Sequence, residues 1–297
     1  MRVNPNFSGT VISDIDKSDQ ALQTAYQQVS TNQKVNVASD NPAAAAAYMT
    51  LQSQAANVDQ YTTNADSVLS QAQTADSVMS SVVSLLNRAI TIGTEGASSS
   101  SSADRSSLAL DITGILSNVV SLANTSVGGV SLFGGSVSGT TVFAADASSP
   151  TGYTYNGNDS VNTATVGDEL SVQTNIPGDT LFTNSSANVL GALSSLASAL
   201  TSGSSTDIGA ATVSVTTALN YVSQQHAVYG ATINTLTSQE QYLSQEKVTL
   251  TSQETSLVGI DTATAAENLS SAEVQNSAVY EASAKVLQNS LLNYLQN

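Results

Sequence analysis

The feature that most constrains this chain is a seven-residue apolar repeat that runs through two long stretches. In the first stretch, from about Ala44 to Ile92, the repeat is carried by Val68, Ala72, Ala75, Met79, Val82, Leu86 and Ala89. In the second, from about Asp207 to Val258, it is carried by Leu219, Val222, Tyr229, Ile233, Leu236, Leu243, Leu250 and Leu257. Alternating steps of four and three place these side chains on one helix face, which predicts two long helices packed as in a coiled coil.

Two further helical patterns lie between these stretches. One is formed by Leu108, Ile112, Ile115, Val119 and Leu122, and the other by Val189, Leu190, Leu193, Leu196 and Leu200. The segment from Gly93 to Ser107 contains Gly96 and five consecutive serines, so we expect a flexible turn there. A turn of this kind would return the next helix antiparallel to the first long one.

From Gly128 to about Asn184 the glycines cluster and the helical periodicity disappears, which predicts a β-rich insert. Tyr155-Asn156-Gly157-Asn158 contains an Asn-Gly pair, which favours a tight hairpin turn. Leu170, Val172 and Ile176 alternate as they would along one side of a strand. An insert of about 55 residues is near the lower limit for an independent domain, so we expect it to pack against the helices.

Each end of the chain carries an amphipathic helical pattern, separated from the adjacent long helix by a polar break. The N-terminal stripe contains Ile15, Leu22 and Val29; the C-terminal pattern contains Leu269, Ala272, Ala282, Val286, Leu287, Leu291, Leu292 and Leu295. Because the rest of the sequence predicts no broad apolar surface that could cover these stripes, we expect the ends to pair with each other or with neighbouring subunits. Isolated short helices are marginal in water, so we predict ends that are poorly ordered in the monomer and become helical on assembly.

The N-terminal break also shows where the first long helix starts. Asn41 can cap exposed backbone N–H groups, and Pro42 has a fixed backbone angle and lacks an N–H where none is needed. The preceding segment, Lys34 to Val37, is too short and polar for a core strand. It is therefore predicted to be an extended connector between two helices.

Together these patterns predict a mainly α fold with a small β-rich insert, built as an elongated antiparallel helical bundle or coiled-coil rod. We expect five segments: an N-terminal helix and connector (1–40), half of a helical rod (41–127), the β-rich insert (128–185), the other half of the rod (186–259) and a C-terminal helix (260–297). The first and last segments are expected to pair.

Composition argues against several classes of function. Seven Lys and Arg against 23 Asp and Glu give a net charge of −16, which would repel a nucleic-acid backbone. The absence of Cys excludes a disulfide framework and thiolate chemistry. We expect no membrane insertion, because the most apolar windows are interrupted well short of the roughly 20 residues that a bilayer requires.

The sequence also lacks the motifs of enzymes, so we expect no catalytic residues, no cofactor and no metal site. It contains no phosphate-binding loop, no His-Glu-x-x-His and no Gly-x-Ser-x-Gly elbow. Asp14-x-Asp16-x-Ser18 begins like a calcium loop but lacks the later Gly and Glu. The only histidine, His226, is predicted to be a surface or packing residue, since no second ligand or positioned acid is apparent.

Several short motifs occur in order along almost the whole chain. They are Val29-Ser30-Thr31-Asn32-Gln33-Lys34, Ser39-Asp40-Asn41-Pro42-Ala43, Leu122-Ala123-Asn124-Thr125, Leu132-Phe133-Gly134-Gly135, Tyr155-Asn156-Gly157, Asn175-Ile176-Pro177-Gly178-Asp179 and Ser290-Leu291-Leu292-Asn293-Tyr294-Leu295. In this order they resemble the flagellin family, and within it the hook-filament junction branch. Asn32 stands where the family usually has glycine.

The resemblance implies a structural protein of the bacterial flagellum that serves motility and is secreted by flagellar type III export. It would form the junction between hook and filament by helical self-assembly. The implied partners are hook-associated protein 1, flagellin, further copies of itself and a flagellar export chaperone. The implied assembly interface, formed by the paired terminal helices in an inner tube, contains Ile15, Leu22, Val29, Leu287, Leu291 and Leu295.

Two other hypotheses stay open. The chain could be flagellin, the major filament subunit, which would share the fold and the export route. It could also be an unrelated secreted coiled-coil adhesin or needle-tip protein, since heptad stripes by themselves indicate helix packing and nothing more.

Overall fold

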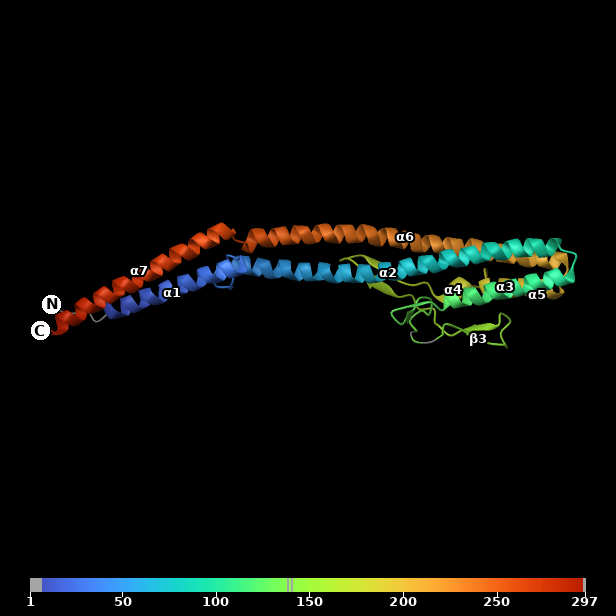
Figure 1. The fold of residues 1–297 in the computed structure, drawn as a ribbon, viewed down its shortest axis with the longest axis horizontal. Helices are drawn as coiled ribbons and strands as arrows, with labels where there is room; N and C mark the ends of the chain where they lie inside the picture. The colour runs from blue at the N-terminus through green and yellow to red at the C-terminus, as the bar shows by residue number, and fades with distance from the viewer. Residues whose placement is uncertain (1–6, 138, 140, 296–297) are drawn as a thin grey trace. The chain divides into compact units, whose positions relative to one another are not determined.

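The computed structural model describes residues 7–137, 139 and 141–295, and most of these residues are helical (Figure 1). The helices are α1 (Phe7–Thr31), α2 (Pro42–Ser98), α3 (Ser102–Ala123), α4 (Gly178–Phe182), α5 (Val189–Ser202), α6 (Ser205–Val258) and α7 (Thr262–Leu295). The strands are β1 (Ser126–Val127), β2 (Val130–Ser131), β3 (Phe143–Ala145), β4 (Tyr153–Tyr155), β5 (Thr163–Thr165) and β6 (Ser171–Gln173). The predicted mainly α fold with a small β-rich insert is confirmed.

Contacts between residues divide the chain into two compact units. We call residues 1–57 together with 245–297 the terminal unit, and residues 58–244 the central unit. Helices α2 and α6 contribute to both units, whereas α1 and α7 belong to the terminal unit alone. The six strands belong to the central unit and form three separate antiparallel pairs, β1 with β2, β3 with β4 and β5 with β6.

The heptad stripes form the core of the central unit, as their spacing predicts. Met79, Val82 and Leu86 of α2 are completely buried, and so are Val222 and Leu236 of α6. Helix α3 lies alongside α5, and their apolar residues join those of α2 and α6 in one cluster. The shared members from α3 and α5 are Ile112, Ile115, Val119, Leu190, Leu193, Leu196 and Leu200.

The turn expected from Gly93 to Ser107 is much shorter than predicted. Helix α2 continues to Ser98, and α3 begins at Ser102 after Ser101, whose hydroxyl accepts a hydrogen bond from the Asp104 N–H at 3.3 Å. Gly93 and Gly96 are therefore buried helical residues. A Cβ at Gly96 would overlap Leu200. These glycines let neighbouring side chains approach the helix backbone, and they do not reverse the chain.

The insert packs against the helices, as its small size predicts. The rings of Phe133 and Phe182 meet edge to face with centroids 5.4 Å apart, and Phe143 meets Phe182 at 5.7 Å. All three belong to the same apolar cluster as the helix stripes. Buried Tyr229 of α6 accepts a hydrogen bond from the Ile176 N–H at 3.3 Å, and burial raises the pKa of its phenol.

The hairpin predicted at Tyr155-Asn156-Gly157-Asn158 is wrong. Strand β4 pairs antiparallel with the preceding strand β3, with Phe143 opposite Tyr155. The turn of this hairpin therefore lies before Tyr153. Asn156 and Gly157 follow the hairpin instead of forming its turn. The strand predicted from Leu170 to Ile176 is also shorter, because β6 ends at Gln173. An Asn-Gly pair carries no information about which of the neighbouring segments are strands, and that is decided here by pairing.

The β5–β6 hairpin is fastened to both long helices within the central unit. Val166, between the two strands, is fully buried with Ala65, Val68 and Leu236. The Asn64 side-chain amide donates to the Thr165 carbonyl at 2.8 Å, and that of Gln239 donates to the Val166 carbonyl at 2.9 Å. These bonds satisfy carbonyl groups that a two-stranded sheet leaves unpaired.

Among the described helices, α3 alone is long and apolar enough to cross a membrane by length and composition, with a mean hydropathy of 1.4. One face of this helix is already covered by other helices, whereas Leu110 on another face is 74% exposed. Ile112, Ile115 and Val119 are buried in the central core, beside α5. Its hydropathy therefore fits a core helix.

Candidate assembly interface

Helices α1 and α7 pair along their lengths, as predicted for the two ends of the chain (Figure 1). On the facing sides, the covered residues of α1 are Val11, Ile15, Ser18, Leu22, Ala25 and Val29, with Gln28 half-buried beside them, and those of α7 are Ala265, Leu269, Ala272, Asn276, Val279, Ser283 and Val286. Both sets follow steps of four and three. The pair is antiparallel, because Asp19 contacts Tyr280 whereas Tyr26, further along α1, contacts Glu273.

The most buried positions of the seam between α1 and α7 hold small side chains, and its larger aliphatic side chains are only half-buried. Ala25, Ala265 and Ala272 are its most buried apolar members, and Ser283 is buried as well. Ile15, Leu22 and Val29 are only half-buried. A seam of this kind removes little apolar surface from water, so it contributes much less stability than a seam of buried leucines.

Hydrogen bonds supplement this thin seam, with Asp19 at their centre. Its carboxylate accepts from the Asn276 side-chain amide at 2.7 Å and from the Tyr280 hydroxyl at 3.0 Å. The Tyr26 hydroxyl donates to the Glu273 carboxylate at 3.1 Å. The hydrogen bond to Glu273 raises the pKa of Tyr26, and the one to Asp19 raises the pKa of Tyr280. Ionisation of either phenol would remove the donor and place two negative charges side by side.

The connectors at the inner ends of α1 and α7 are joined by backbone hydrogen bonds. Gln33 and Gly259 form an antiparallel bridge, the Lys34 N–H donates to the Val258 carbonyl at 2.7 Å, and the Ile260 N–H donates to the Asn32 carbonyl at 3.1 Å. Asn32 has φ of +54°, in the left-handed region. Glycine adopts this conformation freely and asparagine tolerates it, which explains how Asn32 can stand where the resembling family has glycine.

The start of α2 is capped as predicted. The Asn41 side-chain oxygen accepts from the Ala44 N–H at 3.1 Å, and Pro42 is the first helical residue. Before it, the Asp40 carboxylate accepts from the N–H groups of Asn36 and Val37 at 3.0 and 3.1 Å. The connector, predicted to be extended over Lys34 to Val37, belongs to no strand there and is held by local side-chain bonds.

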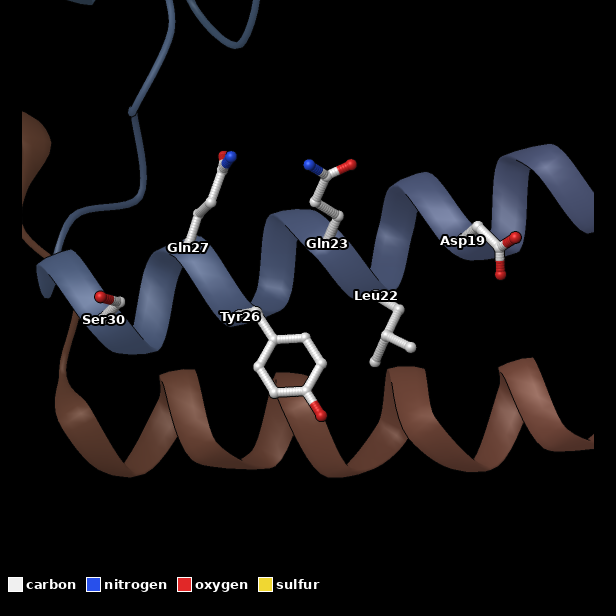
Figure 2. Close-up of a pocket in the computed structure, with 6 residues that line it drawn as sticks. All are labelled: Asp19, Leu22, Gln23, Tyr26, Gln27 and Ser30. Atoms are coloured by element: carbon white, nitrogen blue, oxygen red, sulfur yellow. The ribbon is translucent and has the colours of Figure 1, made fainter.

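An open groove of about 500 Å³ lies along one side of α1. It is lined by Asp19, Leu22, Gln23, Tyr26, Gln27 and Ser30. In Figure 2, Leu22 and Tyr26 point toward α7, whereas Gln23 and Gln27 point away from it. The groove therefore joins the edge of the seam to a polar face of α1.

The predicted interface residues are only partly placed. Ile15, Leu22 and Val29 lie in the α1 seam facing α7. Leu287, Leu291 and Leu295 belong to helix α7, but their side chains lie outside the described part of the chain. The assignment of all six to an interface between subunits stays a prediction.

The sequence analysis missed the apolar residues on the outer surfaces of the terminal unit. Ile12, Met49, Val248 and Val274 are each at least 60% exposed. A second groove, of about 580 Å³, is lined by Ala47, Thr50, Leu51, Gln253, Ser256 and Leu257. The signal of Ile12, Met49, Val248 and Val274 in the sequence is that they fall outside the four-three repeat, so the partner helix does not cover them.

The only histidine has an acidic partner that the sequence does not reveal. His226 Nε2 lies 2.9 Å from Asp76 Oδ1, which joins α6 to α2 within the central unit. The contact links two packed helices, which fits the packing role expected of His226. Among the described residues, no group of three or more His, Asp or Glu side chains is placed to hold a metal ion.

Two protein-family models match the chain. The bacterial flagellin N-terminal helical region matches residues 6–138, and the bacterial flagellin C-terminal helical region matches residues 212–295. Together they account for most of the chain and for both of its ends. A search of curated protein sequences finds no match.

Solved structures share the fold. A provisionally assigned flagellar hook-associated protein from Vibrio parahaemolyticus matches with a TM-score of 0.66 and 20% identity, covering 73% of this chain and 99% of that one. Flagellar hook-associated protein-3 from Legionella pneumophila matches at 0.64 and 15%, covering 70% and 98%. FlgL from Bacillus cereus matches at 0.60 and 21%, covering 69% and 99%. Identities this low establish a common fold and do not by themselves assign a role to the chain.

Proposed function

The chain belongs to the flagellin family, and on that premise we propose that it is a structural subunit of the bacterial flagellum that forms the junction between hook and filament. The main support is the match of flagellin models to both ends of the chain, combined with a fold shared with hook-associated proteins. The flagellin family consists of structural proteins, so the proposed role is mechanical and not enzymatic.

The terminal unit supplies the physical reason for assembly. Its α1–α7 seam is thin, and it carries exposed apolar side chains such as Ile12, Met49 and Val274. Covering such residues in contacts between subunits removes apolar surface from water without requiring any change in the central unit. We place the inner-tube contacts on Ile15, Leu22, Val29, Leu287, Leu291 and Leu295, as expected from the sequence.

The contacts between subunits would be heterologous and helical. Each subunit then offers one surface to the neighbour on its hook side and a different one to the neighbour on its filament side. On this proposal the partners are hook-associated protein 1, flagellin and further copies of the same chain. The protein would be secreted through the flagellar export channel, with an export chaperone holding the C-terminal helix beforehand.

The main alternative is flagellin, the filament subunit. It is favoured by the family models themselves, which describe flagellin regions. It is less consistent with the three solved structures described above, which are hook-associated or FlgL proteins with 98% or more of their length covered. The hypothesis of an unrelated adhesin or needle-tip protein has no support from these matches.

Deleting the gene separates the two remaining functions. If the protein forms the junction, the deletion strain should keep its hooks, lack filaments and release monomeric flagellin into the medium. If it is the filament subunit, hooks should remain with no flagellin released. Electron microscopy and an assay of the medium read both outcomes, and a strain that is fully motile with normal filaments would contradict both proposals.

A matched pair of complementing variants tests the role of the terminal unit. Leu22→Asp places a charge in the α1–α7 seam, whereas Gln23→Asp places one on the face of α1 that points away from α7 (Figure 2). We expect Gln23→Asp to restore filaments more fully than Leu22→Asp. Equal restoration by both would count against a role for the α1 stripe in assembly.

A further inference from the structure

Asn156 and Gly157 form the only Asn-Gly pair in the chain, and they lie directly after strand β4. Asn156 is exposed and belongs to no helix or strand. Its backbone N–H donates to the Val142 carbonyl at 2.8 Å, at the end of the β3–β4 hairpin. Its side-chain amide makes one long contact, to the Thr141 carbonyl at 3.4 Å. A bond of that length restrains a side chain weakly.

Packing explains why glycine follows this asparagine. A Cβ at Gly157 would overlap the phenol ring of Tyr155. That ring cannot move aside easily, because the Tyr155 hydroxyl lies 3.0 Å from both the Phe133 and the Asn158 carbonyl oxygens, and the ring packs on Phe143. Only glycine fits at this position without displacing the tyrosine. Among the described residues, the Gly157 N–H has no hydrogen-bond acceptor.

We propose that Asn156 is a site of spontaneous deamidation. The Gly157 backbone nitrogen attacks Cγ of Asn156, forming a new C–N bond. The bond from Cγ to Nδ2 breaks, and ammonia leaves with the proton from the Gly157 amide. Water then opens the resulting five-membered succinimide at either carbonyl, giving aspartate or isoaspartate. Asparagine is a thermolabile residue, and a following glycine offers no side chain to obstruct the attack.

Nearby asparagines lack one or more of these conditions. Asn158, two residues further on, accepts from the Ser136 N–H at 2.9 Å and donates to the Ser136 hydroxyl at 2.8 Å. It is followed by Asp159, whose side chain hinders attack by the backbone nitrogen. Asn175 is buried and followed by Ile176. An exposed asparagine followed by glycine is therefore found at Asn156 and at neither of these two asparagines.

Deamidation would alter the end of the β3–β4 hairpin. An ionised carboxylate has no N–H, so the contact from Asn156 to the Thr141 carbonyl would be lost. Isoaspartate also adds a carbon to the main chain, which would shift Gly157 relative to the Tyr155 ring against which it packs. As the protein ages, deamidation at Asn156 would therefore progressively alter the local structure of the insert.

The test uses the purified full-length protein, kept folded in warm neutral buffer and sampled over time. A protease that cuts before Asp releases residues 146–158, a peptide whose only asparagines are Asn156 and Asn158. We expect the mass shift of deamidation to appear at Asn156 and not at Asn158. Conversion to aspartate creates a new cleavage site before residue 156, whereas isoaspartate keeps the peptide whole with the shifted mass.

Two controls keep the test decisive. Asn156→Gln should abolish the shifted peptide with an unchanged circular dichroism spectrum, because a longer side chain forms the corresponding ring far more slowly. The urea-unfolded protein shows the conversion that an unrestrained chain undergoes over the same period. The proposal is overturned if the folded protein shows no shift at Asn156 while the unfolded protein does, or if Asn156 and Asn158 convert equally.

Discussion

The terminal and central units use the same heptad spacing with different side chains. In the central unit the stripes carry large residues that are fully buried, such as Leu86, Ile112 and Leu193. In the α1–α7 seam the buried positions hold Ala25 and Ala272, together with the serine at 283. Spacing therefore sets the geometry of both units, whereas the size of the side chains sets how much apolar surface each one buries.

The difference suits two distinct tasks. A core of large side chains gives the central unit a single well-packed arrangement. A thin seam supported by exposed hydrogen bonds lets α1 and α7 pair within one chain while leaving apolar surface for other contacts.

Limited proteolysis should distinguish the α1–α7 pair from the rest of the chain most clearly. We expect mild protease treatment of the purified protein to trim both ends toward a core that begins near Asn41 and ends near Gly259. The α1–α7 seam buries little apolar surface, so it opens more often than the central core does. Gel electrophoresis and mass spectrometry would identify the limiting fragment. A full-length chain that resists cleavage as long as the central unit does would contradict the contrast.

Truncation of one large side chain in each unit compares their energetics. Phe182→Ala removes a fully buried ring that meets both Phe133 and Phe143, and it should lower the free energy of unfolding by about 3–5 kcal/mol. Leu22→Ala, at a half-buried seam position, should lower it by about 1 kcal/mol. Urea unfolding followed by circular dichroism measures both. Similar losses in the two variants would show that the seam is as tightly packed as the core.

Two glycines in central helices sharpen the account of packing. Gly96→Ala places a Cβ against Leu200 and should destabilise the protein by about 1–3 kcal/mol. Gly114 has no atom within 4 Å of the same added Cβ, so Gly114→Ala should stabilise the protein by about 0.5–1 kcal/mol. Thermal unfolding of the two variants provides the measurement. A stabilising effect at both positions would mean that Leu200 moves aside freely.

Alkaline pH should weaken the pairing of α1 with α7, with the smallest effect of the four. Tyr26 and Tyr280 have raised pKa values in the folded chain, because they donate to the Glu273 and Asp19 carboxylates. The stabilisation is complete below the unfolded phenol pKa of about 10 and is lost as the pH rises through the folded value. Amide exchange of α1 and α7 across this range should show the loss. A Tyr26→Phe/Tyr280→Phe variant should lack it, and the same dependence in that variant would refute the assignment.

Several features of the fold followed from local sequence. The stripes predicted the buried faces of α2, α3, α5 and α6, because a helix of fixed period repeats the same face at every turn. Asn41 and Pro42 predicted the start of α2, since a cap acts only on the neighbouring N–H groups. Within the chain α1 lies along α7, which is one of the two pairings expected for the ends.

Other features depended on contacts between distant residues. Gly93 and Gly96 suggested a turn but lie inside α2. Glycine is needed at both positions because Leu196, Leu200 and Thr212 occupy the space that a Cβ would take. Asn156 and Gly157 suggested a hairpin but follow one, because β4 pairs with β3 before them. The acidic partner of His226 lies on another helix, 150 positions away at Asp76, and no local pattern indicates it.

The candidate interface shows the same division. Ile15, Leu22 and Val29 were identified from spacing, whereas the contacts of Asp19 with Asn276 and Tyr280 appear only once the two helices are paired. The exposed apolar residues Ile12, Met49 and Val274 could be recognised only after the covered face of each helix was known.

The sequence by itself determined which segments are helical, where the first long helix starts and which face of each helix is apolar, since these depend on residues within a few turns of one another. The tertiary structure decided which faces meet, which glycines are needed for close packing and which apolar side chains stay uncovered. The reason is that the hydrophobic effect is non-directional. Periodicity places apolar side chains on one face of a helix, but which other surface buries that face depends on the packing of the whole chain.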